Sequence, residues 1–293
     1  MYTVSNAAFD ALVFLAPMLP AAVGGLATEL AGTLNIALEG LILTGAFVYV
    51  AAASVAGPIA GAFIALAVTA AVSYGMDGIS RKAKADSFVV GLGINMLAPA
   101  LASILSQVFF GTKGVVVVPG LQSSRVLESL SSTSFVGPVF GHRLSDYLAI
   151  LVAMVIGVAL AYTPFGLRAR AAGQNPEALR MAGLDAGRLR GIAFLVSGVA
   201  CGASGAALAA SLGAYVPNMS AGRGWIALVA IYLGGKDLVG TVVASAFFAL
   251  LLSVASGAQS LSVAPPELLM ALPYFVTAIV VIAGSYGALR RRH

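Results

Sequence analysis

The sequence has very few charged residues for its length. Only 9% of its 293 residues are Asp, Glu, Lys or Arg, whereas 60% are hydrophobic and the mean hydropathy is +0.99. Soluble globular domains carry about a quarter charged residues, so this composition excludes a soluble protein. We expect an all-α, polytopic membrane protein with about eight to ten transmembrane helices, some of them broken or re-entrant.

Residues that commonly carry catalysis or hold metals are scarce. The single cysteine, Cys201, lies among small apolar residues, so it forms no intrachain disulfide and is interpreted as a packing residue. The two histidines, His142 and His293, have no metal-ligand partner at a useful spacing, so we expect no metal. The sequence also lacks the Gly-x-Ser-x-Gly, His-Glu-x-x-His and phosphate-loop motifs. We therefore expect that the chain is not an enzyme, binds no cofactor and cannot hydrolyse ATP alone.

Long apolar runs make up most of the chain, which we interpret as a single transmembrane domain over residues 1–293. About 20 apolar residues cross a bilayer. On that basis the sequence predicts nine approximate spans: 9–28, 36–56, 57–76, 88–110, 147–163, 191–211, 215–235, 238–257 and 268–286. No basic segment precedes the first run, so we expect a retained span rather than a cleaved signal peptide. The helical part of 215–235 looks short, which predicts a broken span followed by a tight turn at 234–237.

Basic residues between the apolar runs predict the orientation of the chain. They gather at 77–87, at 164–190 and at the C-terminal 290–292, and basic loops stay in the cytoplasm. The C-terminus is therefore expected inside, the N-terminus outside, and 111–146 is expected to form an extracytoplasmic loop. An ordered connector at the membrane surface is favoured for this loop over a ligand-binding loop. Orientation accounts for the net charge of +5, so we expect no nucleic-acid partner.

The cytoplasmic loop 164–190 contains five arginines and a helix start. Asn175 is predicted as the N-cap, Pro176 as the first helical residue and Glu177 as a first-turn acid favoured by the helix dipole. Gly183 is predicted to end this helix. A two-turn helix outside the membrane, flanked by arginines, is interpreted as a docking element.

Polar residues interrupt the apolar background at 29–40, where two glycines and Asn35 predict a break in the helix. Carboxylates in or beside spans are costly and commonly face a cavity, and broken helices are tolerated there. Glu39 is interpreted either as part of a translocation pathway or as a helix cap, with equal weight; the pathway is less favoured for Glu29, at the cytoplasmic boundary. Asn95 is interpreted either as a hydrogen-bonding partner of a polar solute or as a residue that links two helices by hydrogen bonds, with the second preferred. Asn35, Glu39 and Asn95 are the candidate pathway residues.

Small residues recur at helical spacing later in the chain, at Gly198, Gly202 and Gly205. Such a stripe lets two membrane helices approach closely. We interpret it as a packing surface.

Three stretches, in this order and spacing, resemble one family. They are ELAGTLNIALEGLILTGAF (29–47), FGLRARAAGQNPEALRMAGLD (165–185) and GRGWIALVAIYLGGKDLVG (222–240). Together they resemble permease subunits of bacterial ABC importers of the simple-sugar and nucleoside branch, and the resemblance covers about residues 20–260. The 111–146 loop is similar to that of the shorter permease of nucleoside-type systems. The sequence departs from the family at Ala31 and Ala37, where Ser and Gly are frequent.

The resemblance implies a multi-pass permease of the bacterial inner membrane, surrounded by lipid and paired with a second permease, as a heterodimer, around a central pathway. Two ABC ATPase subunits, or a fused ATPase, would bind the ATP, and an extracytoplasmic solute-binding protein would deliver the solute. The expected solute is neutral and polar: nucleosides first, with simple sugars or a riboflavin-type compound as alternatives. The residues expected to contact the ATPase are Arg170, Gln174, Asn175, Pro176, Glu177, Arg180 and Gly183.

The main alternative is a proton-coupled secondary transporter in which Glu29 or Glu39 carries the proton. That alternative leaves the arginine-flanked helix without a purpose. A structural membrane scaffold would explain the small-residue packing but not the interrupted acidic segment.

Overall fold

The computed structural model describes residues 4–125 and 141–260, and these fold into helices with one very small sheet. The helices are α1 (Val4–Leu30), α2 (Leu38–Ala56), α3 (Pro58–Ala83), α4 (Ser87–Phe110), α5 (Leu144–Tyr162), α6 (Pro164–Gln174), α7 (Pro176–Met181), α8 (Ala186–Leu212), α9 (Arg223–Leu233) and α10 (Leu238–Ser260). The strands are β1 (Val116–Val117) and β2 (Ala214–Tyr215). Seven of these helices are long and apolar enough to cross a membrane: α1, α2, α3, α4, α5, α8 and α10. The expected all-α membrane fold is confirmed.

The predicted spans within the described residues all coincide with helices, and the predicted break is present. In the span 215–235 only α9 is helical, and its 11 residues extend about 16 Å, roughly half the thickness of a hydrocarbon core. The turn at 234–237 is closed by backbone bonds from Gly235 to Tyr232 and from Lys236 to Ile231. The predicted span 268–286 and the basic residues 290–292 lie outside the described residues.

Two predicted loops contain more helix than expected. The helix α3 continues to Ala83, so only residues 84–86 connect it to α4, and the basic residues of the predicted 77–87 loop lie mainly on the last turns of α3. The loop 164–190 holds α6, α7 and the first turns of α8. The apolar criterion misses these parts because a helix that leaves the membrane keeps its backbone bonds while its side chains become polar.

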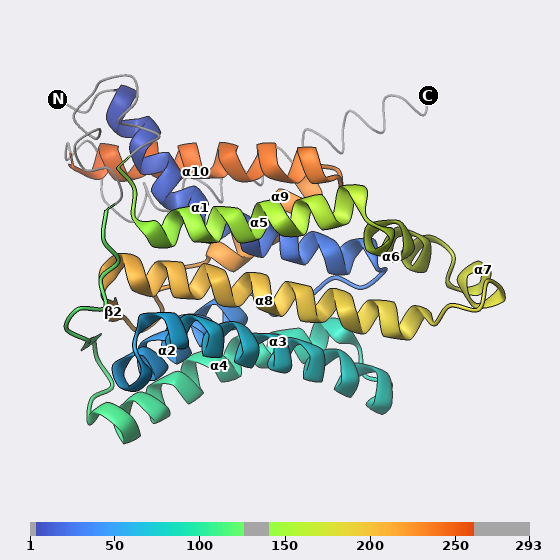
Figure 1. The fold of residues 1–293 in the computed structure, drawn as a ribbon, viewed down its shortest axis with the longest axis horizontal. Helices are drawn as coiled ribbons and strands as arrows, with labels where there is room; N and C mark the ends of the chain where they lie inside the picture. The colour runs from blue at the N-terminus through green and yellow to red at the C-terminus, as the bar shows by residue number, and fades with distance from the viewer. Residues whose placement is uncertain (1–3, 126–140, 261–293) are drawn as a thin grey trace.

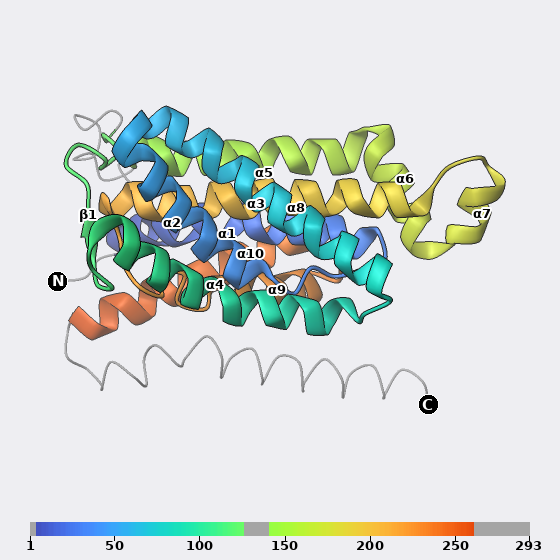
Figure 2. The same cartoon turned by 90° about the horizontal axis from the view of Figure 1, so that it is seen from below.

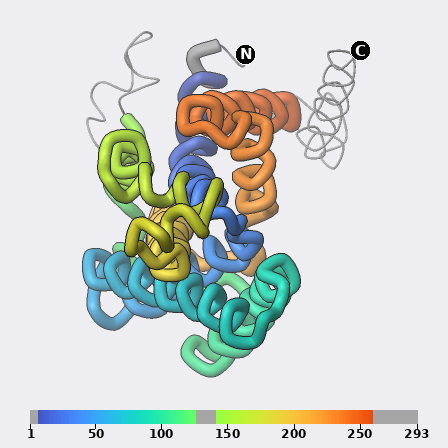
Figure 3. The backbone as a smooth tube through the Cα atoms, turned by 90° about the vertical axis from the view of Figure 1, so that its right-hand side faces the viewer, coloured from blue at the N-terminus to red at the C-terminus, as the bar shows by residue number. Residues whose placement is uncertain are grey.

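The membrane helices run lengthwise between two different ends of the molecule (Figures 1 and 2). At one end α6 and α7 project beyond the other helices; we call this the α7 end. At the other end lie β1 and β2, and we call this the strand end. Viewed from the α7 end in Figure 3, α1 and α8 occupy the centre of the bundle. Accordingly, α1 and α8 are 78% and 72% buried over their most apolar windows, whereas α4 is only 17% buried.

The central helix α8 packs closely on its neighbours through its glycines. A Cβ atom at Gly205 would lie 2.2 Å from the Ile42 carbonyl oxygen of α2, and one at Gly202 would lie 2.3 Å from the Thr69 hydroxyl of α3. Cys201, directly before Gly202, is completely buried. The packing interpretation of the small-residue stripe is therefore confirmed.

At the strand end, backbone hydrogen bonds hold the described parts of the loop predicted at 111–146 against the helices. β1 pairs antiparallel with β2, with Val116 opposite Tyr215, and the Ser123 amide donates to the Ala210 carbonyl of α8 at 2.9 Å. α5 begins at Leu144, three residues before the predicted span, because the Asp146 carboxylate accepts a bond from the Arg143 amide at 3.2 Å. The loop therefore ends at residue 143. Its described ends fit an ordered connector, while its central part, 126–140, lies outside the described residues.

Candidate functional site

The predicted docking helix is present as α7 and is capped at both ends as expected. The Asn175 carboxamide oxygen accepts a bond from the Ala178 amide at 3.0 Å, and Pro176 occupies the first turn. Gly183 has a φ of +77°, which favours glycine. Its amide donates to the Arg180 carbonyl, and the next amide donates back to Leu179, which is the Schellman arrangement that ends a helix.

One side of α7 is anchored and the other is exposed. Leu179 is buried and packs with Ala172 of α6 and Leu189 of α8. In contrast, the side chains of Glu177 and Arg180 are 73% and 69% exposed, and pair with each other at 3.4 Å. The exposed side of a projecting, anchored helix is suited to contact with another protein.

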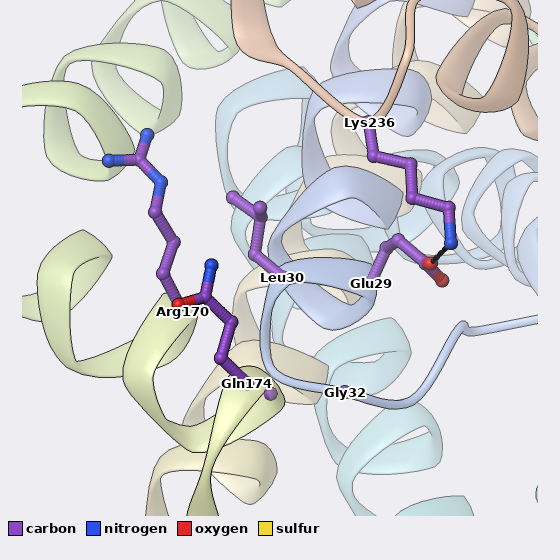
Figure 4. Close-up of a pocket in the computed structure, with 7 residues that line it drawn as sticks. Glu29, Leu30, Gly32, Arg170, Gln174 and Lys236 are labelled. Carbon is purple, nitrogen blue, oxygen red and sulfur yellow. Dashed lines mark ion pairs between the residues drawn. The ribbon is translucent and has the colours of Figure 1, made fainter.

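The other two predicted contact residues, Arg170 and Gln174, lie apart from this tip. They line a cavity of about 470 Å³ between α6, the end of α1 and the turn after α9. Figure 4 shows them on the α6 side, with Glu29 and Lys236 on the opposite side. The structure therefore divides the predicted contact residues between an exposed tip and a pocket.

Glu29 forms an ion pair on the side of this pocket that faces α6. Its carboxylate lies 2.7 Å from the Lys236 ammonium, and the hydrogen bond between them raises the pKa of Lys236. Lys236 consequently stays charged at neutral pH. The pair joins the end of α1 to the turn between α9 and α10, so Glu29 lies at the α7 end of the molecule.

The last turn of α6 rests directly on the interruption between α1 and α2. A Cβ at Gly173 would lie 2.3 Å from the Leu30 carbonyl oxygen and 2.8 Å from the Gly32 amide nitrogen. Gly32 itself has a φ of +86°. The end of α6 and the interruption between α1 and α2 thus touch through their backbones. Sequence reasoning missed Gly173, since its role depends on two segments far apart in the chain.

Replacing Gly173 with alanine is expected to push α6 away from α1, because backbone atoms cannot yield as a flexible side chain does. We expect a fall in thermal stability equivalent to about 1–3 kcal/mol. The measurement is a thermal unfolding curve of the purified chain in detergent. Gly93→Ala on α4 is the control, since nothing lies within 4 Å of a Cβ added there. Equal melting temperatures for both variants and the wild type would contradict the contact.

The interruption between α1 and α2 is held by Asn35, which is completely buried. Its side-chain nitrogen, Nδ2, donates hydrogen bonds to the Ser197 hydroxyl of α8 at 3.0 Å and to the Ser73 hydroxyl of α3 at 3.3 Å. Its carboxamide oxygen accepts a bond from the Ala37 amide at 3.0 Å. The predicted break is therefore present, and Asn35 fixes it to two neighbouring helices.

Glu39 joins the start of α2 to the start of α9. One carboxylate oxygen accepts from the Gly222 amide at 2.8 Å and the other from the Gly224 amide at 2.7 Å. These amides open α9, where the helix dipole favours a negative charge. Gly224 allows this approach, since a Cβ there would lie 2.4 Å from the Glu39 amide nitrogen. Glu39 thus acts as a cap between two helices, and its role in a pathway stays a prediction.

Asn95 of α4 bonds the same region from the other side. Its carboxamide oxygen accepts from the Gly40 amide at 2.8 Å, and its nitrogen donates to the Ile36 carbonyl at 2.8 Å. This is the bonding between helices that was preferred for Asn95. The three candidate pathway residues therefore gather around the beginning of α2, where they satisfy backbone groups that the break leaves without helical partners.

A buried carboxylate at the α7 end was not anticipated from the sequence. The side chain of Asp77 is completely buried and forms ion pairs with Arg81 of α3, at 2.8 Å, and with Arg190 of α8. The four-residue spacing of Asp77 and Arg81 is a sequence signal for a pair on one helix face. The partner on α8 could not be found this way.

The predicted non-ligand histidine His142 is buried and stacks on Phe9, with 4.2 Å between the ring centroids. Across residues 4–125 and 141–260, no three His, Cys, Asp or Glu side chains are grouped so that they could hold a metal. His293 lies outside these ranges.

Known proteins resemble this chain over nearly its whole length. A nucleoside ABC transporter permease, NupC of Lactococcus lactis, is 30% identical, with 92% of this chain and 89% of NupC covered. A guanosine ABC transporter permease, NupQ of Bacillus subtilis, is 28% identical, with 94% and 90% covered. Among solved structures, an inward-facing ABC transporter described as metal-chelate type has a TM-score of 0.53 at 15% identity and covers 96% of this chain and 85% of that chain. This last likeness supports the fold alone.

The family model described as "Branched-chain amino acid transport system / permease component" matches residues 7–283. Together with the two permease relatives, this match confirms the resemblance inferred from the three sequence stretches. The chain therefore belongs to this permease family and is the multi-pass membrane subunit of an ABC importer.

Proposed function

We propose that this permease imports a neutral polar solute, with nucleosides as the first candidates. The names of its relatives NupC and NupQ support this solute class. The small number of charged residues in its spans also favours a neutral solute over an ion. A solute-binding protein would deliver the solute, and a second, similar permease would complete the pathway.

The observation that carries this proposal is the projecting, doubly capped helix α7. Two ATPase subunits, or a fused ATPase, would bind its exposed side, and the exposed residues of α7 would transmit their movement. Arg170 and Gln174 would contact the same partner from the neighbouring pocket. ATP would bind to the ATPases and not to this chain.

The solute would pass beside the meeting point of α2 and α9. Both helices begin after an interrupted segment, and the Glu39 carboxylate at the start of α2 accepts a hydrogen bond from the Gly222 amide at the start of α9. Glu39 and Asn95 are partly exposed and would border the pathway, whereas the buried Asn35 would hold the break in shape. Discontinuous helices that meet in this way commonly form transport sites.

The α7 end would face the cytoplasm and the strand end the outside. Arg81, Lys82, Lys84 and Lys236 lie at the α7 end or on the turns that lead to it, in agreement with the positive-inside rule. The C-terminus would be cytoplasmic because of its three arginines.

The test is nucleoside-stimulated ATP hydrolysis by the reconstituted complex, comparing wild type with the double variant Asn175→Ala, Glu177→Ala. Loss of the N-cap costs about 0.5–2 kcal/mol, enough to disorder a helix of one and a half turns. We expect stimulation to fall at least about fivefold while the ATPase still co-purifies. Lys82→Ala, an exposed basic residue on α3, is the control and is expected to behave as wild type.

Two outcomes would contradict the proposal. One is stimulation by sugars but not by nucleosides, which would overturn the solute class. The other is uptake by the chain alone in vesicles, driven by a proton gradient without a co-purifying ATPase. That result would favour the secondary transporter.

A further inference from the structure

The cluster around Asp77 links three helices at the α7 end. Asp77 lies on α3, and its buried carboxylate contacts Arg81 of the same helix and Arg190 of α8. The Arg190 guanidinium also donates to Ser87, the first residue of α4, at 3.0 Å. Ser87 and Ser80 share a bond of 2.6 Å between their hydroxyls. One guanidinium therefore ties α8 to both α3 and α4.

Arg190 is closely connected to the docking helix. After the turn at Gly183, Asp185 caps α8 by accepting bonds from the Gly187 amide at 2.8 Å and the Arg188 amide at 3.4 Å. Leu189, beside Arg190, packs against Leu179 of α7. The buried side of α7 therefore contacts the turn of α8 that carries Arg190, as well as Ala172 of α6.

The helix α4 leads from this cluster to the candidate pathway. Ser87 begins α4, and Asn95, two turns later, bonds the Gly40 amide and the Ile36 carbonyl at the start of α2. These polar contacts add to the apolar packing of α4, in which Val90 and Ile94 lie against the core. A continuous series of contacts thus runs from α7 through Arg190 and Ser87 to Asn95.

We propose that the Asp77–Arg190 pair is the joint that passes movement of the docking helix to α4 and the start of α2. Asp77 and Arg190 are positioning residues in this proposal, since neither borders the candidate pathway. The proposal rests on the proposed function of α7 as the ATPase contact. It goes further by assigning the route of that movement through the chain.

Arg81 supplies a matched control. It carries the same charge and pairs with the same carboxylate, yet it lies on the same helix as Asp77 and bonds neither α8 nor α4 in the described contacts. A purely structural role, the neutralisation of a buried carboxylate, would make Arg81 and Arg190 equally important. A joint requires only Arg190.

The experiment uses the complete complex in vesicles and measures guanosine taken up per ATP hydrolysed. For Arg190→Gln we expect this ratio to fall at least about fivefold, while the rate of ATP hydrolysis stays within about twofold of wild type. Asp77→Asn is expected to lower the ratio similarly. Arg81→Gln is expected to keep the ratio within about twofold of wild type.

Arg190→Lys provides a second variant in case Arg190→Gln does not assemble. It keeps the charge but not the forked contact to both Asp77 and Ser87, so an intermediate ratio is expected. Equal losses in Arg81→Gln and Arg190→Gln, or a wild-type ratio in Arg190→Gln, would overturn the joint. If the α7 double variant uncouples the complex and Arg190→Gln does not, only the joint is wrong. If the α7 double variant has no effect, the proposed function fails first.

Discussion

Replacing Glu39 with alanine is expected to destabilise the chain strongly and to abolish uptake. The variant leaves the amides of Gly222 and Gly224 without an acceptor at the start of α9. An unsatisfied buried amide costs about 1–3 kcal/mol, and here two of them lose a charged acceptor. The measurements are the melting temperature of the purified chain in detergent and uptake by the reconstituted complex.

Two further variants distinguish a helix-capping role of Glu39 from a role in the solute pathway. Glu39→Gln keeps one acceptor oxygen, so it should recover part of the stability. Glu29→Gln should cost less, because its partner Lys236 is 52% exposed and can bind water instead. If Glu39→Ala melts as wild type does but uptake is lost, the carboxylate serves the solute and not the helix start. That outcome would contradict the cap as its main role.

Replacing Gly205 with leucine is expected to prevent the chain from folding. A Cβ at this position would lie 2.2 Å from the Ile42 carbonyl oxygen and 2.5 Å from the Ala46 amide nitrogen, both on the backbone of α2. The centre of the bundle would have to separate, at a cost above the roughly 1–3 kcal/mol of ordinary overpacking. The yield of monodisperse protein extracted from membranes measures this effect.

Gly75→Leu on α3 is the control for Gly205→Leu. No atom lies within 4 Å of a Cβ added at Gly75, and leucine is a better helix former than glycine. We expect this variant to be extracted in wild-type yield. Normal yield and melting temperature for Gly205→Leu would mean that α8 does not pack against α2 as closely as described.

Sequence patterns predicted the membrane helices well because hydrocarbon thickness imposes a length and a polarity on every span. They also predicted α7, since Asn175, Pro176 and Gly183 satisfy the ends of a helix through bonds within the same few residues. The length of the apolar runs was less useful for α6 and for the extension of α3. There the apolar run stops while the helix continues.

The candidate pathway shows where local reasoning stops. Composition identified Glu39 and Asn95 as costly residues in an apolar setting, and that much was correct. It could not choose between solute contact and helix bonding. The partners of these side chains, Gly222 and Ile36 among them, lie 183 and 59 residues away in the chain.

The sequence by itself determined that this is a multi-pass membrane protein with a capped helix at 175–183 and a broken span, because bilayer thickness and helix capping act over about 20 residues or fewer. Its resemblance to a known family added the permease assignment. Only the tertiary structure decided that Glu39 caps α9, that Gly173 rests on the end of α1, and that Asp77 joins α3 to α8 and, through Arg190, to α4. These contacts satisfy backbone groups and buried charges with partners from distant segments. Which distant partner becomes available depends on how the helices pack, and no local pattern records that choice.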